Sequence, residues 1–568
     1  MICPDKIGLV SSLKFHAIYS PDKIFMHALS SGAEVCISFR CAAWHVEMCR
    51  RQFEAAAVPK GGVVLLFFPQ SWIGIAYFLG AVAHGCTASF MPCPSPKQDP
   101  NKYWLAHRAL IKRIQPSALV TDSRVASDMR NNGMIEDRLA LLIAQPLDEI
   151  VPDGLPDMSR FGPEASTPVL QHSSGTTGLK KGVMLSNAAI MQQVEFYSKA
   201  LEINESDIIV SWLPVYHDMG FVACFLTPLI LGLTVVMLDP FHWVSRPRIL
   251  LDAIARFKGS FCWLPNFAFD HLVRTCPMGS DAPRLDSVRA FVNCSEPCQA
   301  ETFARFAAHF VEAGLRHDAL RVCYAMAEAT FAVTQTPVGE SAHVLTVDGS
   351  FLYSDGLVAP VSDGAGDSAL RLLSAGRPLI GVDLEVRDSE GKPLPPGKVG
   401  EIHLRSLSLF TGYYRMPVET AERLVDGWYA THDRGFMWDD ELYVLGRVDD
   451  LIIVAGRNFH AVEVEAVVNE VRGVKPGRAV AFGVANALRG TADLVIVAER
   501  NEFSDAANGN LEIRRSIREA VFQTFNIYPA EVAVVTPGWL QKTTSGKIER
   551  RSNVERWVRE RSDIQQGG

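Results

Sequence analysis

Short apolar runs alternate with helical patterns through the first 170 residues of the chain. The runs VVLLFF at 63–68 and ALVTD at 118–122 are continuous, and residues 71–84 read as a buried helix. Continuous apolar runs separated by helices are typical of βα units whose parallel strands are covered on both faces. The pattern therefore predicts an α/β architecture with parallel sheets.

A segment of twenty residues, 219–238, has no charged side chain and is long enough to cross a membrane. Pro228 and Gly232 divide it into a helical half, FVACFLTPLILG, and a β-branched half, LTVVML. A buried helix followed by a buried strand explains this composition better than a membrane span.

The composition narrows the class of protein. At 568 residues the chain is too long for one ordinary domain. A net charge of −8 gives no electrostatic reason to expect a nucleic-acid partner. The twelve cysteines are scattered without a Cys-x-x-Cys pair, which favours reduced thiols over disulfides or zinc. The first residues lack a secretory pattern, so a cytoplasmic location is expected.

Residues 171–188, QHSSGTTGLKKGVMLSNA, combine glycines, hydroxyls and lysines after an apolar run that could be a strand. Glycines allow tight turns that bring backbone N–H groups close to an anion, and hydroxyls and lysines add further donors and positive charge. The spacing fits neither a Walker loop nor a dinucleotide fingerprint. A phosphate-binding loop and a flexible surface loop both remain open from these residues alone.

The order SSGTTGLKKG resembles the nucleotide-phosphate loop of the adenylate-forming enzymes, which include acyl-CoA synthetases, acyl-AMP ligases and adenylation domains. Five further segments downstream resemble motifs of this superfamily in its order, so the resemblance covers most of the chain. It implies ATP and Mg²⁺ as cofactors. The loop residues that it assigns to nucleotide binding are Ser173, Ser174, Gly175, Thr176, Thr177, Gly178 and Lys181, with Thr177 also at the metal.

Two middle segments resemble the pocket motifs of the family. SWLPVYHDMGF contains His217, which the resemblance assigns to the catalytic site, and its wording is closest to the fatty acyl-AMP ligases. FVNCSEP contains Ser295 and Glu296 on the adenine side. Trp263 is bulky where small residues are frequent, so either it shortens the acyl tunnel or it is ordinary core packing.

Glu328 is the one carboxylate of RVCYAMAEATF. An unpaired buried carboxylate is costly, so a cation or hydrogen-bond donors must accompany it. The resemblance assigns Glu328 to Mg²⁺, and Tyr324 and Ala325 to the nucleotide. In GWYATHDRGF it assigns Asp433 to both ribose hydroxyls, which suits an acceptor-only group.

The end of the chain resembles the family's mobile lid. Arg447 is expected to reach ribose or phosphate, and Asp449 to act as the hinge. QKTTSGKIERR presents Lys547, which would close over the reacting carboxylate and α-phosphate as a catalytic residue. The expected fold is a large N-terminal domain at 1–447, with parallel sheets and a β-rich subdomain, and a small mobile α+β domain at 448–568.

The implied reaction is attack of a fatty carboxylate on ATP, followed by acyl transfer to a thiol. The long interval from Glu328 to Gly376 is similar to the insertion of fatty acyl-AMP ligases, which load an acyl carrier protein, although it could be an unremarkable loop. Two alternatives remain: an acyl-CoA synthetase, and a scaffold that binds an adenylate without turnover. Departures from the family pattern motivate the scaffold alternative; they are Lys180, Ala325, His432 and Ala461.

Overall fold

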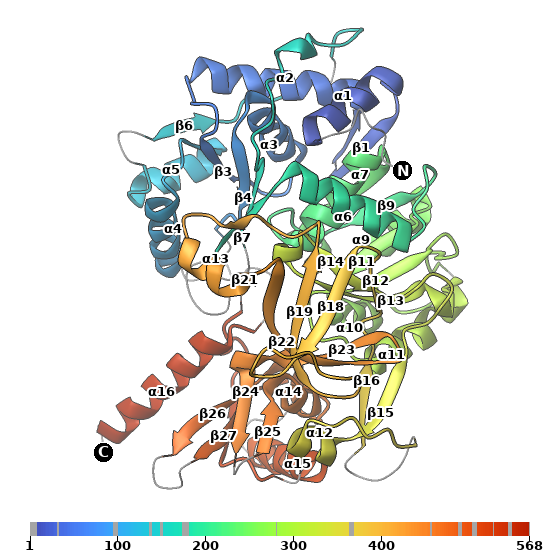
Figure 1. Ribbon diagram of the computed structural model, residues 1–568, viewed down its shortest axis with the longest axis vertical. Coiled ribbons are helices and arrows are strands. Elements are labelled where there is room, and N and C mark those ends of the chain that lie inside the picture. Colours follow the sequence, from blue (N-terminus) through green and yellow to red (C-terminus); the bar gives the residue numbers. More distant parts are fainter. Residues whose placement is uncertain are drawn as a thin grey trace.

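Two large sheets form the upper part of the molecule in the view of Figure 1, and smaller, mainly antiparallel sheets lie below them. The structure is a computed structural model of the whole chain. It describes residues 8–30, 33–94, 100–135, 139–147, 151–172, 181–279, 281–362, 369–454, 457–486, 491–501, 508–525, 527–542 and 548–566.

The first large sheet has seven strands, and its central strands are parallel. Alternate residues of one strand serve two separate cores: Val64 and Leu66 belong to one apolar cluster, while Leu65 and Phe67 belong to another. Burial on both faces explains why 63–68 reads as a continuous apolar run. The strands in spatial order are β20 (Gly412–Tyr413), β8 (Gly182–Leu185), β7 (Val169–His172), β4 (Thr87–Met91), β3 (Val63–Phe67), β5 (Ala118–Thr121) and β6 (Ala140–Ile143).

The second large sheet has nine strands, parallel from β13 through β1 and antiparallel at both ends. It shares the main apolar cluster with the first sheet. Its strands in spatial order are β17 (Arg377–Pro378), β14 (Ala332–Gln335), β13 (Leu320–Ala325), β12 (Ala290–Asn293), β11 (Phe261–Leu264), β9 (Ile208–Ser211), β10 (Thr234–Leu238), β1 (Ile24–Ser30) and β2 (Ala33–Ser38).

Helices cover these sheets, and polar residues mark their starts. Ser71 accepts a hydrogen bond from the Gly74 N–H at the start of α3, and Gly85 ends α3 with a left-handed φ of 93°. The helices of this part are α1 (Leu9–Tyr19), α2 (Phe39–Ala55), α3 (Trp72–His84), α4 (Pro100–Ile114), α5 (Ser123–Asn131), α6 (Asn187–Ala200), α7 (Thr227–Leu231), α8 (Pro240–Ser245), α9 (Arg248–Phe257), α10 (Asn266–Thr275), α11 (Ala300–Phe310) and α13 (Pro417–Arg423).

The uncharged segment 219–238 is a helix followed by a strand. A π-helix, η2 (Met219–Leu226), continues into α7, and Gly232 ends α7 before β10. Met219 through Ile230 are buried. In the part of the chain that the structure describes, no helix is long and apolar enough to span a bilayer.

Antiparallel strands make up the β-rich region near the middle of the view, around β18 and β19 (Figure 1). Its five strands are β18 (Val382–Arg387), β19 (Gly400–Ser406), β21 (Leu424–Val425), β22 (Trp428–Trp438) and β23 (Glu441–Arg447). Between β14 and β17 the chain forms an excursion made of β15 (Val344–Asp348), α12 (Gly349–Asp355) and β16 (Ala369–Leu373), with β15 and β16 paired.

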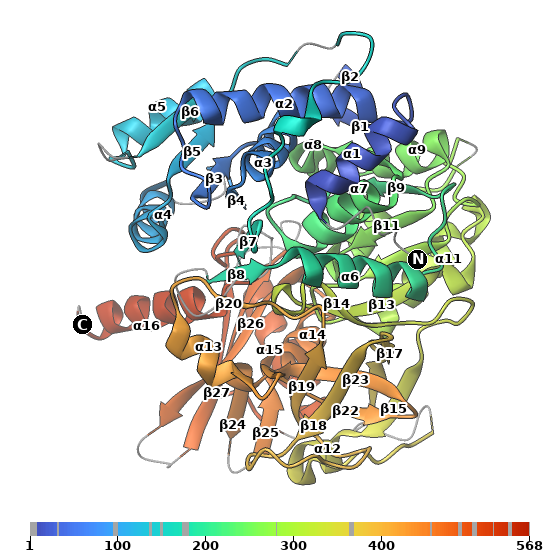
Figure 2. The same ribbon diagram turned by 45° about the horizontal axis from the view of Figure 1, so that its top comes forward.

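The C-terminal region has apolar clusters of its own. It is smaller than the region before it and mixes strands with helices, so the expected α/β class, with a small α+β region at the end, is confirmed. Figure 2 shows α16 extending from it to the C-terminus. Its elements are β24 (Leu451–Val454), β25 (Arg457–His460), α14 (Ala461–Asn469), β26 (Val474–Asn486), β27 (Thr491–Arg500), α15 (Asn508–Phe525), β28 (Glu531–Val535) and α16 (Arg550–Gln566).

Candidate functional site

The structure describes some of the expected site residues and not others. The loop residues Ser173 to Gly178 and the lysine Lys547 lie outside the described residues, as does the side chain of Asp449. The loop's flanks are described: β7 and β8 are antiparallel, with His172 opposite Gly182. The expected strand before the loop is therefore present. The short strand β8 after the loop was not predicted from the sequence.

Glu328 lies in a short 3₁₀ turn, η5 (Ala327–Ala329), directly after β13. The Tyr413 hydroxyl donates a hydrogen bond of 2.8 Å to Glu328 Oε1, and lies 3.1 Å from the Tyr429 hydroxyl. Burial, together with the charge of Glu328, raises the pKa of Tyr413 far above its usual range, so this phenol stays a proton donor. The expected hydrogen-bond donor for Glu328 is therefore Tyr413, a residue that sequence reasoning missed.

Lys181 lies beside this pair. Its Nζ is 4.7 Å from the centre of the Tyr413 ring, and Tyr413 pairs with Val183 across β20 and β8. A cation over an aromatic face is attracted to the ring's electron density. Tyr413 therefore contacts both Lys181, at the end of the candidate phosphate loop, through its ring and Glu328 through its hydroxyl.

Asp433 joins two sheets. Its Oδ2 accepts a hydrogen bond of 2.6 Å from the Tyr324 hydroxyl, and its Oδ1 lies 3.4 Å from Arg447 Nε. Tyr324 is on β13, while Asp433 and Arg447 are directly opposite each other on β22 and β23. Burial and the neighbouring Asp433 raise the pKa of Tyr324 well above its usual range, so the phenol remains protonated.

The positive charge of Arg447 interacts with both candidate site carboxylates, Asp433 and Glu328. Burial alone would lower the pKa of Arg447, but Asp433, Asp450 and Glu328 together raise it above its usual value. The guanidinium is therefore charged. Tyr324, Glu328, Asp433 and Arg447 form one polar surface, and their assignment to a nucleotide site stays a prediction.

His432, which stands where the family has glycine, adopts a φ of 59°. This left-handed conformation favours glycine and is uncommon for other residues. Its N–H donates to Glu401 Oε1 at 2.9 Å. The backbone next to Asp433 therefore keeps the conformation that a glycine would adopt, at the cost of strain of the kind that clusters at functional sites.

The residues expected on the adenine side have mainly structural contacts in the described part of the chain. Ser295 has a φ of 72°, again left-handed, and its hydroxyl lies 3.9 Å from Met219 Sδ. Glu296 Oε2 accepts a hydrogen bond of 3.1 Å from the Phe267 N–H, near the start of α10. Ala325 is the last residue of β13, opposite Ala332.

His217 precedes the π-helix η2, a kind of helix that is often found at functional sites. Its N–H donates to the Pro214 carbonyl at 3.1 Å, and its ring lies 4.7 Å from that of Tyr216. The Tyr216 carbonyl accepts a hydrogen bond of 2.9 Å from Gln171 Nε2, on the strand before the candidate phosphate loop. This hydrogen bond joins the segment that contains His217 to β7, the strand that precedes the candidate phosphate loop.

Trp263 is fully buried. Its Nε1–H donates to the Tyr197 hydroxyl at 2.7 Å, and that hydroxyl donates to Gln335 Oε1 at 3.0 Å. These contacts agree with core packing, and the proposed shortening of an acyl tunnel stays a prediction.

Arg550 fixes the segment that follows Lys547, and sequence reasoning missed this role. Its guanidinium contacts Asp450 at 2.5 Å and Glu465 at 2.8 Å. Asn553, fully buried, donates from Nδ2 to the carbonyls of Gln541 and Glu549, both at 2.9 Å. Both ends of the Lys547 loop are therefore anchored to the C-terminal region.

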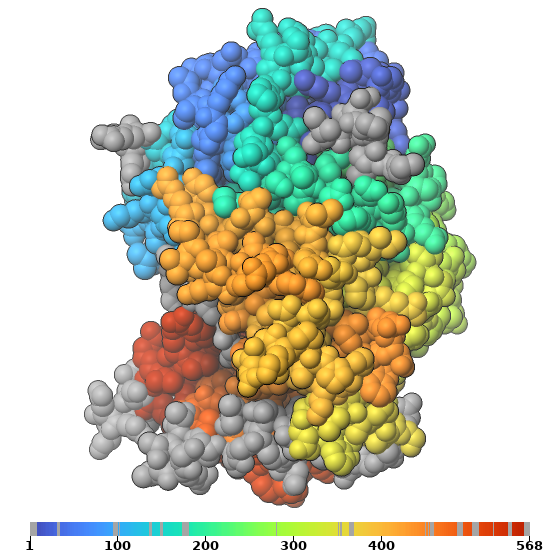
Figure 3. Space-filling view, in the orientation of Figure 1, coloured from blue at the N-terminus to red at the C-terminus, as the bar shows by residue number. Residues whose placement is uncertain are grey.

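The excursion between β14 and β17 contacts the C-terminal region. Leu370 on β16 packs against the apolar cluster of the C-terminal region and also against a cluster shared with β22 and β23. Helix α12 lies against β25. In Figure 3 this excursion, coloured yellow at the bottom of the view, lies beside the orange and red surface.

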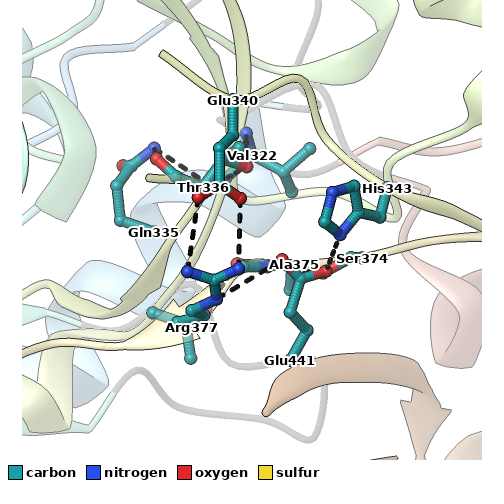
Figure 4. A network of polar contacts seen from close by, with 11 residues as sticks. Val322, Gln335, Thr336, Glu340, His343, Ser374, Ala375, Arg377 and Glu441 are labelled. Atoms are coloured by element: carbon teal, nitrogen blue, oxygen red, sulfur yellow. Dashed lines mark hydrogen bonds and ion pairs between the residues drawn. The ribbon is translucent and has the colours of Figure 1, made fainter. Parts of the chain in front are cut away.

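Ion pairs hold the base of this excursion. Arg377 lies 3.1 Å from Glu340 and 3.9 Å from Glu441, and His343 Nδ1 lies 3.0 Å from the other Glu441 oxygen. Figure 4 shows Arg377 between the two carboxylates, with His343 on the far side of Glu441. Glu441 is 3% exposed, so the neighbouring positive charge is needed to compensate it.

Comparisons with known proteins agree with this arrangement. A family model described as AMP-binding enzyme matches residues 20–414. Long-chain-fatty-acid–AMP ligase FadD32 of Mycolicibacterium smegmatis is 30% identical, over 97% of this chain and 94% of the relative. The medium-chain-fatty-acid–[acyl-carrier-protein] ligase JamA of Moorena producens is 29% identical, over 87% of this chain and 85% of the relative.

A solved structure of a related protein has a similar fold over nearly the whole chain. The fatty acyl-adenylate ligase from L. pneumophila, in complex with acyl adenylate and pyrophosphate, has a TM-score of 0.73 and 25% identity, with 98% of each chain covered. The chain therefore belongs to the AMP-binding enzyme family, in which these relatives are fatty-acid ligases.

Proposed function

We propose that the protein is a fatty acyl-AMP ligase, which activates a fatty carboxylic acid with ATP and passes the acyl group to the phosphopantetheine thiol of an acyl carrier protein. The observation that carries this proposal is the polar surface of Tyr324, Glu328, Asp433 and Arg447, built from two sheets in a chain of the AMP-binding family. Its cytoplasmic location stays a prediction from the sequence.

The nucleotide would be held by groups of complementary charge. Asp433 is an acceptor for ribose hydroxyls, and the Tyr324 hydrogen bond and Arg447 fix its orientation. Tyr324 and Ala325 would face the adenine, with Ser295 and Glu296 beside it. The phosphates would lie on the loop 173–178 and on Lys181.

Magnesium fits Glu328 because Mg²⁺ prefers oxygen ligands and binds through one or two carboxylates plus phosphate oxygens. Tyr413 donates to Oε1 of Glu328, which leaves Oε2 to face a cation, and Thr177 would supply a second ligand. The metal would neutralise charge on the ATP phosphates.

Catalysis would rest on positioning and electrostatics. The carboxylate of the fatty acid attacks the α-phosphorus, forming an acyl–phosphate bond and releasing pyrophosphate, and Lys547 stabilises the charge that develops. His217 would line the acyl and nucleotide pocket. After adenylation, residues 448–568 would rotate about Asp449 and remove Lys547 from the site.

A carrier protein is favoured over free coenzyme A because of the excursion between β14 and β17. Leu370 and α12 pack on the C-terminal region, and such contacts restrain the rotation that the transfer step needs. A carrier protein that binds the lid could supply interaction energy for that rotation, whereas a small free thiol supplies less. Among the relatives, JamA is a ligase for an acyl carrier protein.

The geometry argues against the alternative function, a scaffold that binds an adenylate without catalysing its formation. Two of its motivating departures are Ala325 and His432, and His432 keeps the left-handed backbone that glycine would adopt. Glu328 and Asp433 both retain hydrogen-bond donors that orient them for ligands.

Removing the lysine should separate the two half-reactions. We expect Lys547→Ala to abolish acyl-adenylate formation, because a cation at the reacting phosphate is lost, while transfer from preformed acyl-adenylate to the carrier continues. Pyrophosphate release and acyl transfer, measured separately, check this. Equal loss of both activities would mean that Lys547 has a structural role.

Removing the ribose acceptor should weaken nucleotide binding. A hydrogen bond to a charged group contributes about 1.5–3 kcal/mol, so we expect Asp433→Asn to raise the KM for ATP about tenfold or more. Asp383→Asn is the matched control, because Asp383 is an exposed residue of β18 that pairs with Arg405 on β19. An unchanged KM for ATP in Asp433→Asn, measured at saturating fatty acid, would contradict the role.

Weakening the contact between the excursion and the C-terminal region should allow coenzyme A to serve as acyl acceptor more readily. We expect Leu370→Ser to raise acyl-CoA formation at least about threefold, while adenylate formation stays unchanged, because a buried apolar contact to the C-terminal region is lost. Leu357→Ser, at an exposed leucine of the same excursion, is the control. Equal acyl-CoA yields from the two variants would show that the contact does not set acceptor choice.

A further inference from the structure

An imidazole, a carboxylate and a thiol, all side chains of types that bind metals, lie close together at the edge of the nine-stranded sheet, on β1 and β2. His27 and Cys36 are directly opposite each other in the antiparallel pair, and Glu34 lies two residues before Cys36, on the same face. The candidate nucleotide residue Tyr324 is on β13, near the other end of this sheet. The cluster is therefore separate from the site described above.

The donor atoms of this cluster have the spacing of a zinc tetrahedron. His27 Nδ1 lies 3.0 Å from Glu34 Oε1 and 3.3 Å from Cys36 Sγ, and that sulfur lies 3.7 Å from Glu34 Oε1. Zinc-to-ligand distances of about 2.0–2.3 Å in tetrahedral geometry put ligand atoms about 3.3–3.6 Å apart. The three atoms therefore approximate one face of such a tetrahedron.

Neighbouring residues orient the donors. Arg256, near the end of α9, contacts Glu34 Oε2 at 2.6 Å, which leaves Oε1 facing the histidine and the cysteine. The Phe257 ring lies 4.6 Å from the His27 ring. Contacts that hold a ligating carboxylate or imidazole in one orientation are typical of metal sites.

A second group of side chains that could hold a metal ion has a different arrangement. Among the described residues two such groups occur, and the other is Glu340, His343 and Glu441. There, Arg377 already lies between the two carboxylates (Figure 4), and the set has no sulfur. In the first group, Arg256 contacts Glu34 Oε2, while the other oxygen, Oε1, faces His27 Nδ1 and Cys36 Sγ.

We propose that His27, Glu34 and Cys36 bind a zinc ion that clips β2 to β1. Imidazole, thiolate and carboxylate together suit zinc better than magnesium or calcium, which prefer oxygen ligands. Binding forms bonds from the ion to Nδ1, Oε1 and Sγ, releases the thiol proton of Cys36 to solvent, and leaves the fourth position to water. The clip would secure an exposed edge strand.

Zinc titration of the full-length protein, free of any histidine tag, tests the proposal. After chelator treatment, Zn²⁺ is titrated in excess Mg²⁺ against a competing chromophoric chelator. We expect one ion per chain, and an affinity at least about tenfold lower in His27→Ala and in Cys36→Ser. His343→Ala is the matched control and should bind as the parent does. Unchanged binding in Cys36→Ser, or loss of binding in His343→Ala, would overturn the assignment.

Alkylation of the thiols gives a second readout that does not need a variant. Cys36 is exposed, and Cys93 is half-buried and serves as internal reference. Iodoacetamide labelling followed by peptide mass spectrometry should show Cys36 protected by Zn²⁺ at least about tenfold, with Cys93 unaffected. Equal labelling of Cys36 with and without Zn²⁺ would refute a zinc–thiolate bond.

Discussion

The hydrogen bond from Tyr324 to Asp433 joins the nine-stranded sheet to the antiparallel sheet, and the candidate nucleotide site depends on it. It places an acceptor-only carboxylate beside Arg447, whose charge also acts on Glu328. A second tyrosine, Tyr413, orients Glu328 in the same way. Each carboxylate is thus held in one orientation by a phenol whose burial keeps it protonated, as the proposed binding of a nucleotide and its metal requires.

Side-chain contacts also hold the C-terminal region in place. Arg550 anchors the segment after Lys547 by pairing with Asp450 beside the expected hinge and with Glu465. Leu370 joins the excursion to the C-terminal region through an apolar contact. Ion pairs therefore stabilise the interior of the C-terminal region, and the apolar packing of Leu370 contributes to its contact with the excursion.

The parallel sheets could be predicted from the sequence because alternate residues of 63–67 face two cores and leave a continuous apolar run. Asp433 and Glu328 could be proposed from motif order. The contact between Tyr413 and Glu328 could not be predicted, because the two residues are 85 positions apart in the sequence. The π-helix 219–226 and the left-handed φ of His432 depend on tertiary contacts, which local patterns do not encode.

The central claim is that this chain forms an acyl-adenylate and passes it to a carrier protein. Mass spectrometry of products tests it most directly, with purified protein, magnesium ATP and a panel of fatty acids, run with coenzyme A or with a pantetheinylated carrier protein. We expect acyl-AMP in every reaction and acyl transfer only to the carrier. Free acyl-CoA as the main product, or no adenylate with any acid, would contradict it.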